Sequence, residues 1–229
     1  MRKMDFRVDE SSRDKLRGLD LGYLCFEGVK VCKSEPISDA EVASATLEAQ
    51  EKFKDSSKIA DEPIIKGIRK LFSNAGIDPT KERPSGEALI RRVCDGKNIY
   101  RINNVVDSNN AISIRTACPC GAYDLEKIDG DAITIRVGGK GESYLGIAGK
   151  TMNAEGKIVS IDGKGIFGGP TADSERTSIG YGANEILMLI YHPDSASTNA
   201  LEKAMKMATD IMQRSMGCKM IYEGILFIK

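Results

Sequence analysis

The spacing of hydrophobic and polar positions changes character along the 229-residue chain. Apolar residues recur three to four positions apart in segments 38–53, 61–76 and 85–96, which predicts three helices in the first half. Ser38 and Glu41 have the spacing of a capping box, so the first helix is expected to begin at Ser38. The second segment has a proline in its first turn and closes on a glycine, a pattern typical of helix ends.

The second half of the chain is dominated by alternating or continuous apolar segments, which predict strands. One long helix is also expected there, capped by Ser197 or Asn199 and ended by Gly217. The first residues are compatible with a short polar helix. The strands are expected at 21–31, 131–137, 143–148, 157–161, 185–191 and 219–228. These elements predict a mixed α+β fold, with helices weighted to the first half and the C-terminal end.

The segment 101–131 departs from both patterns. Asparagine and aspartate side chains compete for backbone hydrogen bonds and are poor in helix interiors, yet this segment places four asparagines beside apolar residues. Such a run is not optimised for a helix alone. Its polar groups either brace the backbone or line a binding site, and the sequence leaves both interpretations open.

Three arginines surround the third predicted helix, namely Arg83, Arg91 and Arg92. Arg91 and Arg92 are adjacent, so they cannot both face the same direction. The group is either solvated charge or a basic patch for phosphate, and these alternatives also stay open.

The composition excludes several classes of function. Apolar residues make up 41% and charged residues 29% of the chain, as in an ordinary globular protein, and the formal net charge is zero. A protein that coats nucleic acid by bulk electrostatics is therefore not expected, although a local basic face is compatible with this balance. The charged first residues lack a signal-peptide pattern, and no apolar run reaches about 18 residues. A cytoplasmic protein is expected.

The six cysteines and the single histidine do not assemble a recognisable metal or catalytic motif. Cys118 and Cys120 are separated only by Pro119, and no C-x-x-C pair is present, so reduced thiols are expected, with no metal and no cofactor. The glycines of 163–168 match a dinucleotide fingerprint, but no helical pattern follows them. His192 lies at a predicted strand end and is expected to be structural or exposed.

Three stretches, in their order and spacing, resemble a known family. The first holds R-P-S, E-A-L and R-R at 83–92. The second runs from R-I-N and V-V-D-x-x-N at 101–110 to the turn C-P-C-G-A-Y-D at 118–124 and I-D-G at 128–130. The third is G-I-F-G-G with D-S-E-R-T at 165–177. Together they are similar to the free-standing B3/B4 domain proteins, which resemble the tRNA-editing module of the phenylalanyl-tRNA synthetase beta subunit.

The resemblance implies an α+β fold with a β-sandwich-like mixed sheet core flanked by helices. It implies a single domain over 1–229, with the best-matching core at 60–193, an N-terminal strand and helix extension at 1–59, and a C-terminal helix and strand at 194–229. It also implies hydrolysis of the ester of mischarged tRNA in trans, by an aminoacyl-tRNA deacylase that does not itself charge tRNA. The implied partners are the 3′ end of tRNA or aminoacyl-tRNA and a small amino-acid ligand, with no role for DNA or a membrane.

Two positions depart from the synthetase pattern. The synthetase turn reads Q-P-x-H-A-F-D, whereas this chain has Gly121 in place of the histidine. An acidic residue follows the Gly-Gly loop of the synthetase, whereas this chain has Pro170. The amino-acid pocket is therefore expected to differ from that of the synthetase.

Candidate site residues follow from ester hydrolysis, which needs a positioned water, a proton acceptor and donors for the oxyanion. Glycines suit backbone N–H donation, asparagines suit a ribose or amino acid, and arginines suit a phosphate. The catalytic candidates are Asp173, Ser174, Thr177 and Asn110. The substrate-binding candidates are Asn103, Asp107, Asn109, Gly121, Gly168, Gly169, Arg101 and Arg176.

A structural role is an open alternative for each candidate: bracing for the asparagines, capping for Asp173 and Ser174, and turn geometry for the glycines. For the protein as a whole, the alternative to a deacylase is a non-catalytic module that binds RNA, tRNA or an amino acid and has lost hydrolysis. A small-molecule enzyme on the same scaffold is a third interpretation.

Overall fold

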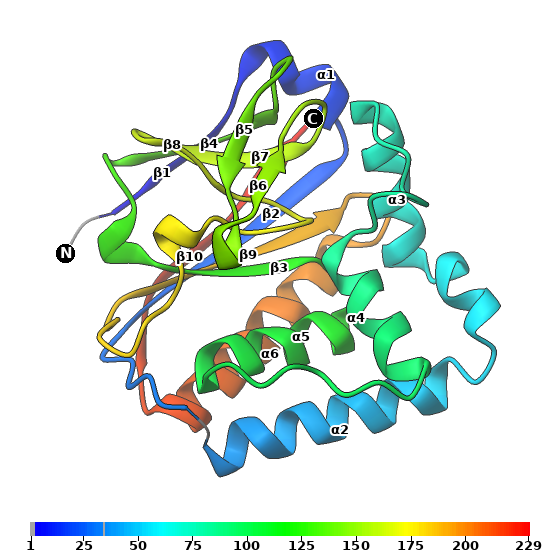
Figure 1. The fold of residues 1–229 in the computed structure, drawn as a ribbon, viewed down its shortest axis with the longest axis vertical. Helices are drawn as coiled ribbons and strands as arrows, with labels where there is room; N and C mark the ends of the chain where they lie inside the picture. Colours follow the sequence, from blue (N-terminus) through cyan, green and yellow to red (C-terminus); the bar gives the residue numbers. More distant parts are fainter. Residues whose placement is uncertain (1–2, 34) are drawn as a thin grey trace.

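Two four-stranded sheets pack face to face, and helices cover the outer side of one of them (Figure 1). The computed structural model describes residues 3–33 and 35–229. Contacts between the sheets are aromatic as well as aliphatic: the rings of Phe6 and Tyr23 stack with centroids 3.8 Å apart. The fold is therefore the mixed α+β type that the sequence predicts, with a sandwich-like core.

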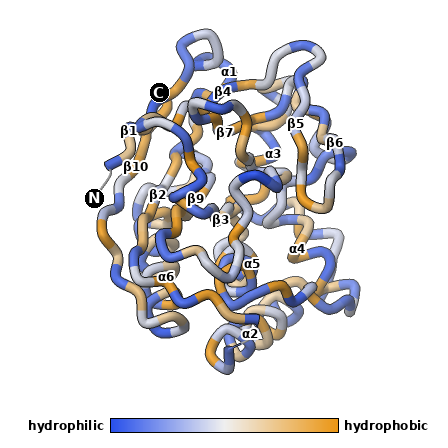
Figure 2. Tube along the Cα trace, turned by 60° about the vertical axis from the view of Figure 1, so that its left-hand side comes forward, coloured by the Kyte–Doolittle hydropathy of each residue, from blue (hydrophilic) through white to orange (hydrophobic). Residues whose placement is uncertain are grey.

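The helix-covered sheet holds the most apolar strands. In spatial order these are β10 (Lys219–Ile228), β2 (Leu19–Glu27), β9 (Ile186–Pro193) and β3 (Cys120–Asp124), all antiparallel to their neighbours. Every residue of β9 is buried, and β2 is apolar along most of its length (Figure 2). β3 lies at one edge of this sheet, next to the helices.

The second sheet has the order β1 (Asp5–Val8), β4 (Ala132–Val137), β7 (Ile158–Asp162) and β8 (Gly165–Gly168). β1 pairs in parallel with β4, and the other pairs are antiparallel. A separate hairpin joins two three-residue strands, β5 (Ser143–Leu145) and β6 (Thr151–Asn153). Residues near both chain ends thus take part in the sheets, because β1 is an edge strand of one sheet and β10 is an edge strand of the other.

In the described part of the chain, five helices of ten residues or more pack around the sheet that contains β3. They are α2 (Pro36–Lys52), α3 (Pro63–Ala75), α4 (Ser85–Cys94), α5 (Asn104–Thr116) and α6 (Thr198–Met216). In Figure 1, α5 and α6 lie under the sheet and α2 lies beneath them. α5 is central to this layer, because it contacts α2, α4, α6 and β3.

The predicted helices are confirmed, but the first one starts earlier than expected, and α5 was not predicted, because asparagine and aspartate are poor in helix interiors. Glu35 is the N-cap of α2 and its side chain accepts the N–H of Ser38 at 2.9 Å, so the capping-box prediction is wrong. α3 begins at Pro63 and ends at Gly76, whose φ of 97° lies in the left-handed region that favours glycine. The short helix α1 (Arg13–Leu16) lies among the first residues, which the sequence showed to be compatible with a short polar helix.

The predicted strands are confirmed within a few residues, whereas four strands, β1, β3, β6 and β8, were not predicted. β1, β6 and β8 have three or four residues each, which is too short for a clear alternation. The alternative that His192 is exposed is wrong: this residue of β9 is fully buried, and burial lowers its pKa to about 4.

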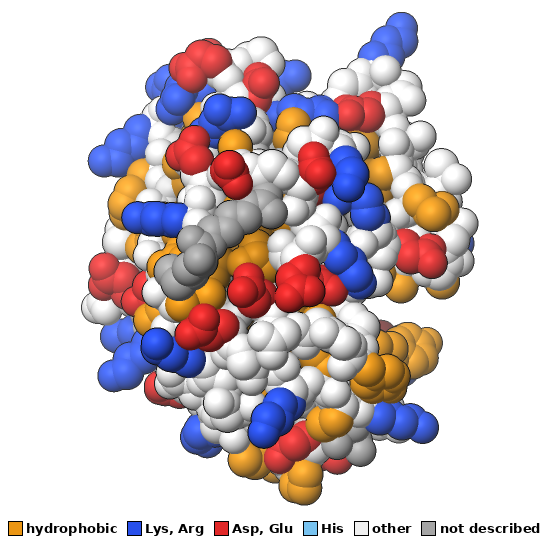
Figure 3. Space-filling view, turned by 90° about the vertical axis from the view of Figure 1, so that its left-hand side faces the viewer, with side chains coloured by type: hydrophobic (Ala, Val, Ile, Leu, Met, Phe, Trp, Pro, Cys, Tyr) orange, Lys and Arg blue, Asp and Glu red, His pale blue; other side chains and the backbone are white. Residues whose placement is uncertain are grey.

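The surface carries both signs of charge in close mixture. On the face shown in Figure 3, Lys and Arg side chains are interspersed with Asp and Glu, so no field of one sign covers it. Within the described residues, no helix combines the length and the apolar character needed to span a membrane.

Candidate functional site

A cavity of about 270 Å³ lies where α4, α5, β3 and the loop after β8 meet. The backbone N–H of Ser85, at the start of α4, donates to the carbonyl of Pro170 at 2.8 Å and ties the helix to this loop. Much of the wall is apolar, formed by Ala88, Leu89 and Val106 among others. The polar or charged residues that line the cavity are Arg83, Ser85, Asn109, Asn110, Thr171 and Asp173.

Asp173 is the carboxylate of this cavity. Burial raises its pKa to about 6. The hydrogen bonds from the Tyr123 hydroxyl and the backbone N–H of Gly169 lower the pKa, but by less. The Tyr123 hydroxyl donates to Oδ1 of Asp173 at 2.7 Å. No Lys or Arg of the described chain compensates the charge. Asp173 therefore changes its charge near neutral pH, in a place that a ligand can reach.

Tyr123 reaches Asp173 because two glycines leave room for its hydroxyl. A Cβ at Gly121 or at Gly168 would overlap this hydroxyl, and one at Gly168 would also come within 2.7 Å of Oδ1 of Asp173. The Tyr123 ring is fully buried and meets Phe167 edge-on, with centroids 4.8 Å apart. Gly121 and Gly168 thus lie behind Asp173 rather than in the cavity wall, whereas Gly169 lines the cavity.

Asn109 and Asn110 bring two amides of α5 to the cavity. The Nδ2 of Asn109 donates to the Cys120 carbonyl at 3.2 Å, which fixes the side chain, while its buried Oδ1 has no partner among the described residues. Asn110 is half-buried and its side chain bonds to no described residue. The buried Oδ1 of Asn109 is thus a costly unpaired acceptor beside the cavity, whereas the Asn110 amide is free to bond a ligand.

The other polar residues of this segment brace the N-terminus of α5. Asn103 is the N-cap and accepts the N–H of Val106 at 2.9 Å. Asp107 is fully buried, accepts the N–H of Ile102 at 3.1 Å and lies 3.0 Å from Nε of Arg101. Burial raises its pKa, and Arg101 counteracts this. Asn103, Asp107 and Arg101 are not in the cavity wall.

Three predicted residues of the loop after Asp173 also hold the backbone. Ser174 donates to the Leu145 carbonyl at 3.1 Å, and Thr177 donates to that of Phe167 at 3.2 Å. Arg176 forms a two-pronged ion pair with Asp162, at 2.8 and 2.9 Å. The structure therefore brings together Asp173, Asn109, Asn110 and Gly169, and places the other predicted site residues outside the cavity.

Sequence reasoning missed three polar residues of the cavity, namely Arg83, Ser85 and Thr171. Arg83 lines the cavity mouth, is exposed and forms no ion pair with a described residue. Thr171 lines the cavity and makes no hydrogen bond to a described residue. Arg83 stands directly before the Pro-Ser start of a helix, a signal that predicts proximity to the helix N-terminus. By contrast, Arg91 turns to the buried Glu87 at 2.7 Å, so the three arginines form no common patch.

Cys120 also lines the cavity, but its thiol is a poor nucleophile. Burial raises its pKa to about 12, so the thiolate is scarce at neutral pH. The neighbouring Cys118 is buried as well, and its pKa is raised for the same reason. The cavity's chemistry therefore rests on its carboxylate, amides and backbone N–H groups.

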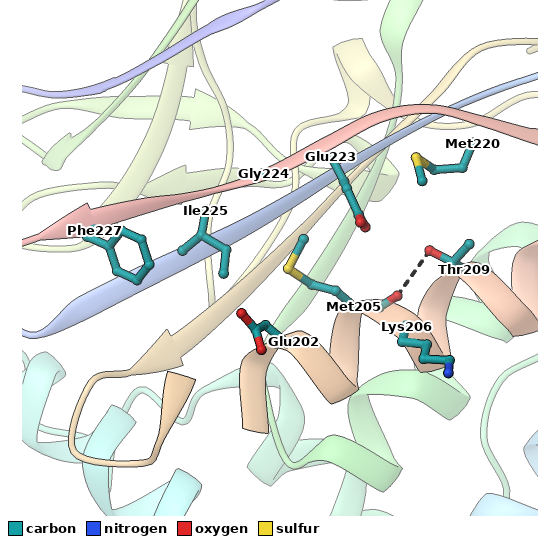
Figure 4. A pocket seen from close by; sticks show the side chains of 9 residues that line it. All are labelled: Glu202, Met205, Lys206, Thr209, Met220, Glu223, Gly224, Ile225 and Phe227. Atoms are coloured by element: carbon teal, nitrogen blue, oxygen red, sulfur yellow. Dashed lines mark hydrogen bonds between the residues drawn. The ribbon is translucent and has the colours of Figure 1, made fainter. Parts of the chain in front are cut away.

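A larger cavity, of about 600 Å³, lies elsewhere, between α6 and β10 (Figure 4). Its charged residues Glu202, Lys206 and Glu223 are exposed, and Thr209 donates to the Met205 carbonyl at 3.1 Å. It has no buried ionisable group that points inward. The smaller cavity at Asp173 is therefore the candidate site.

Comparison with known proteins decides the family. The family profile of the B3/4 domain matches residues 67–216. This chain belongs to the B3/4 domain family. The match includes α4, α5, β3, the loop after β8 and all of α6, and hence every wall of the cavity at Asp173.

Curated relatives of this B3/4 domain protein are phenylalanine–tRNA ligase beta subunits. That of Chromobacterium violaceum is 29% identical over 119 residues, which is 50% of this chain and 15% of the subunit. That of Streptococcus thermophilus is 25% identical over 156 residues, 63% of this chain and 16% of the subunit. The matched part thus spans about one-sixth of the length of these relatives.

A solved structure supports the same fold. The N-terminal fragment of the phenylalanyl-tRNA synthetase beta subunit from Pyrococcus horikoshii superimposes with a TM-score of 0.50 at 14% identity. It covers 98% of this chain, and the alignment covers 55% of that fragment. At this identity the likeness concerns the fold alone.

The Gly121 departure from the synthetase turn now has a physical explanation. The turn H-A-F-D of the resemblance becomes G-A-Y-D here, so two positions change together. Because a Cβ at Gly121 would overlap the Tyr123 hydroxyl, any side chain there is incompatible with this tyrosine conformation. The hydroxyl takes the space of a side chain and serves Asp173.

Proposed function

We propose that this B3/4 domain protein hydrolyses the ester bond of mischarged aminoacyl-tRNA in trans, with Asp173 as the proton acceptor. The observation that carries the proposal is a reachable carboxylate whose pKa is raised to about 6, in a small cavity with free amide groups. A general base is most effective when its pKa lies near the working pH. The family and its relatives, all tRNA ligase subunits, support tRNA as the substrate class.

The reaction requires few groups. The Asp173 carboxylate takes a proton from a water molecule as the water oxygen attacks the ester carbonyl carbon. The resulting oxyanion accepts hydrogen bonds from Asn110 and Thr171, which have no other described partner. The bond between the carbonyl carbon and the ribose oxygen then breaks, and the proton on Asp173 passes to that oxygen. The products are a free amino acid and tRNA with its hydroxyl restored.

The size of the cavity limits what enters it. At about 270 Å³ it lies just below the usual range for sites that hold whole small molecules. An aminoacyl group with part of its ribose suits this volume, whereas a complete nucleotide would extend outside. Apolar residues such as Leu89, Val106 and Ala122 line it, which favours an amino acid with an apolar side chain.

The proposal is tested with a panel of tRNAs, each charged with a correct or an incorrect amino acid. Ester loss is followed over time with wild-type protein, Asp173→Asn and Asn110→Ala, in the cytoplasmic pH range. We expect at least one mischarged tRNA to be deacylated by the wild type and far more slowly by Asp173→Asn. If no tRNA is deacylated above the Asp173→Asn background, the protein is not this enzyme, and saturable binding without hydrolysis would instead indicate a non-catalytic binding module.

A further inference from the structure

An exposed aromatic ring lies outside the cavity, on the segment between α4 and α5. Tyr100 is 70% exposed, the highest value among the large hydrophobic side chains identified as exposed. The Arg92 guanidinium lies 4.1 Å from the centre of its ring, and Nε of Arg92 donates to the Asn98 carbonyl at 2.7 Å. This hydrogen bond fixes the guanidinium over one side of the ring and leaves the rest of the ring open to solvent.

The ring contacts a side chain that stands one helical turn from the cavity wall. Ala88 on α4 lines the cavity, and Arg92 follows it by four residues on the same face of the helix. One turn of helix rises about 5.4 Å, which is between one and two base steps of about 3.4 Å in a stacked strand. A chain that leaves the cavity along α4 therefore passes Arg92, whose guanidinium contacts the Tyr100 ring.

We propose that Tyr100 and Arg92 form a stacking site for a base near the single-stranded 3′ end of tRNA. The inference rests on the proposed function, because an aminoacyl group in the cavity leaves the preceding nucleotides outside. Aromatic rings with nearby arginines bind single-stranded nucleic acid through base stacking, without reading sequence. Neither Arg92 nor Arg83 forms an ion pair with a described residue, so both cations are available to the phosphates between the cavity and the ring.

The neighbouring segment supports a rigid platform. Arg101 pairs with Asp39 and Asp107, and the N–H of Ile102 bonds to Asp107, so both residues after Tyr100 are anchored to helices. Ile102 is itself 54% exposed and extends the apolar surface beside the ring. A ring held in place loses little conformational freedom when a base stacks on it.

Binding of the uncharged oligonucleotide 5′-ACCA-3′ tests the stacking site without any reaction. Fluorescence anisotropy of the labelled oligonucleotide is compared for wild type, Tyr100→Ala, Tyr100→Phe and Tyr181→Ala. Tyr181 is the matched control, since it is 65% exposed and does not line the cavity. We expect Tyr100→Ala to weaken binding about five-fold or more, with Tyr100→Phe and Tyr181→Ala close to wild type. Equal affinity of Tyr100→Ala and wild type, or no saturable binding by wild type, would overturn the site.

A second measurement separates this inference from the proposed function. Hydrolysis is measured on a mischarged tRNA and on a methyl ester of the same amino acid, which has no nucleotides. Tyr100→Ala should raise KM for the tRNA by about the same factor by which it weakens oligonucleotide binding. It should leave kcat and the rate of methyl ester hydrolysis unchanged. If the oligonucleotide binds through Tyr100 but no tRNA is hydrolysed, the function fails and the stacking site stands. If hydrolysis is normal and Tyr100→Ala does not change KM, the stacking site fails and the function stands.

Discussion

Asp107 and Asp173 belong to the two polar segments on either side of the cavity, and burial raises the pKa of both, yet their surroundings differ. Asp107 is fully buried beneath the start of α5 and has a cation, Arg101, at 3.0 Å. Asp173 lines a cavity and has only neutral donors, the Tyr123 hydroxyl and the Gly169 N–H. A buried carboxylate that is paired with a cation supports the fold, whereas an unpaired one beside a cavity is available for chemistry.

The same division holds for the amides of α5. Asn103 and Asn104 bond to the backbone of neighbouring segments: Oδ1 of Asn104 accepts the Cys32 N–H at 2.9 Å, and its Nδ2 donates to the Lys30 carbonyl at 2.8 Å. Asn109 and Asn110, one turn or more further along, keep free groups at the cavity. Position along the helix, rather than residue type, separates the two uses.

The largest expected effect is on hydrolysis when Asp173 is changed. Asp173→Asn should lower kcat by about 10² to 10⁴, because an amide cannot accept the proton of the attacking water. The matched variant Asp107→Asn should retain most of its rate per folded molecule, since Asp107 is not in the cavity wall. Single-turnover deacylation of one mischarged tRNA measures both. Comparable rate losses in the two variants would remove the distinction between the carboxylates.

The reverse ranking is expected for stability. Asp107→Ala should lower the free energy of unfolding by about 2 kcal/mol, because it removes the acceptor of the Ile102 N–H and leaves Arg101 with Asp39 only. The figure is smaller than for a fully buried pair, since Arg101 is partly exposed. Urea unfolding at neutral pH provides the value. An unchanged midpoint would show that Asp107 does not brace α5.

Asp173→Asn should instead stabilise the fold above neutral pH, by about 1–2 kcal/mol. The folded pKa of about 6 lies above the unfolded value of about 3.9, so the fold favours the protonated form. The contribution of Asp173 to the free energy of unfolding is fully present below about pH 4 and is lost as the pH rises through about 6. The unfolding free energies of wild type and Asp173→Asn should therefore agree near pH 4 and diverge as the pH rises to about 7. A difference that does not change with pH would show that it does not come from the titration of Asp173.

His192 gives stability the opposite pH dependence, and it is present in both wild type and Asp173→Asn. Its pKa is lowered to about 4 by burial, so its contribution to stability is lost as pH falls from about 6.5 towards 4. Because it is common to wild type and Asp173→Asn, it cancels in their difference. The pH dependence of that difference therefore reports Asp173.

The smallest effect concerns the hydroxyl behind Asp173. Tyr123→Phe removes a hydrogen bond that lowers the pKa of Asp173, so the acid limb of the pH–rate profile should move to higher pH, by less than about one unit. The fully buried ring and its contact with Phe167 remain. A shift to lower pH would mean that the hydroxyl acts on Asp173 in another way.

The sequence predicted most of the longer elements but neither α5 nor β3, which wall the cavity, and it was insufficient for the roles of individual side chains. Helical and strand periods predicted α3, α6 and β9 well, because each has a long apolar pattern. The family resemblance located both segments that flank the cavity, and the family is confirmed. β1 and β8 were missed, since their pairing is set by partners distant in the chain.

Site residues were harder to predict because capping and binding use the same side chains. Asn103, Ser174 and Thr177 have the composition of a site, but their hydrogen bonds all go to the backbone. Whether an amide or hydroxyl is satisfied internally depends on tertiary packing that no local pattern records. The catalytic and binding roles assigned to Asp173, Asn109, Asn110 and Gly169 stay predictions, as does the extent of the domain over 1–229.

The pH–rate profile of deacylation tests the central claim most directly. Single-turnover hydrolysis of one mischarged tRNA is measured from pH 5 to 8 with wild type and Asp173→Asn, with spontaneous ester loss subtracted. The wild-type rate should rise with an apparent pKa of about 6 and level off above pH 7, while the rate of Asp173→Asn stays low and lacks this step. A wild-type profile that matches that of Asp173→Asn would show that Asp173 is not the base.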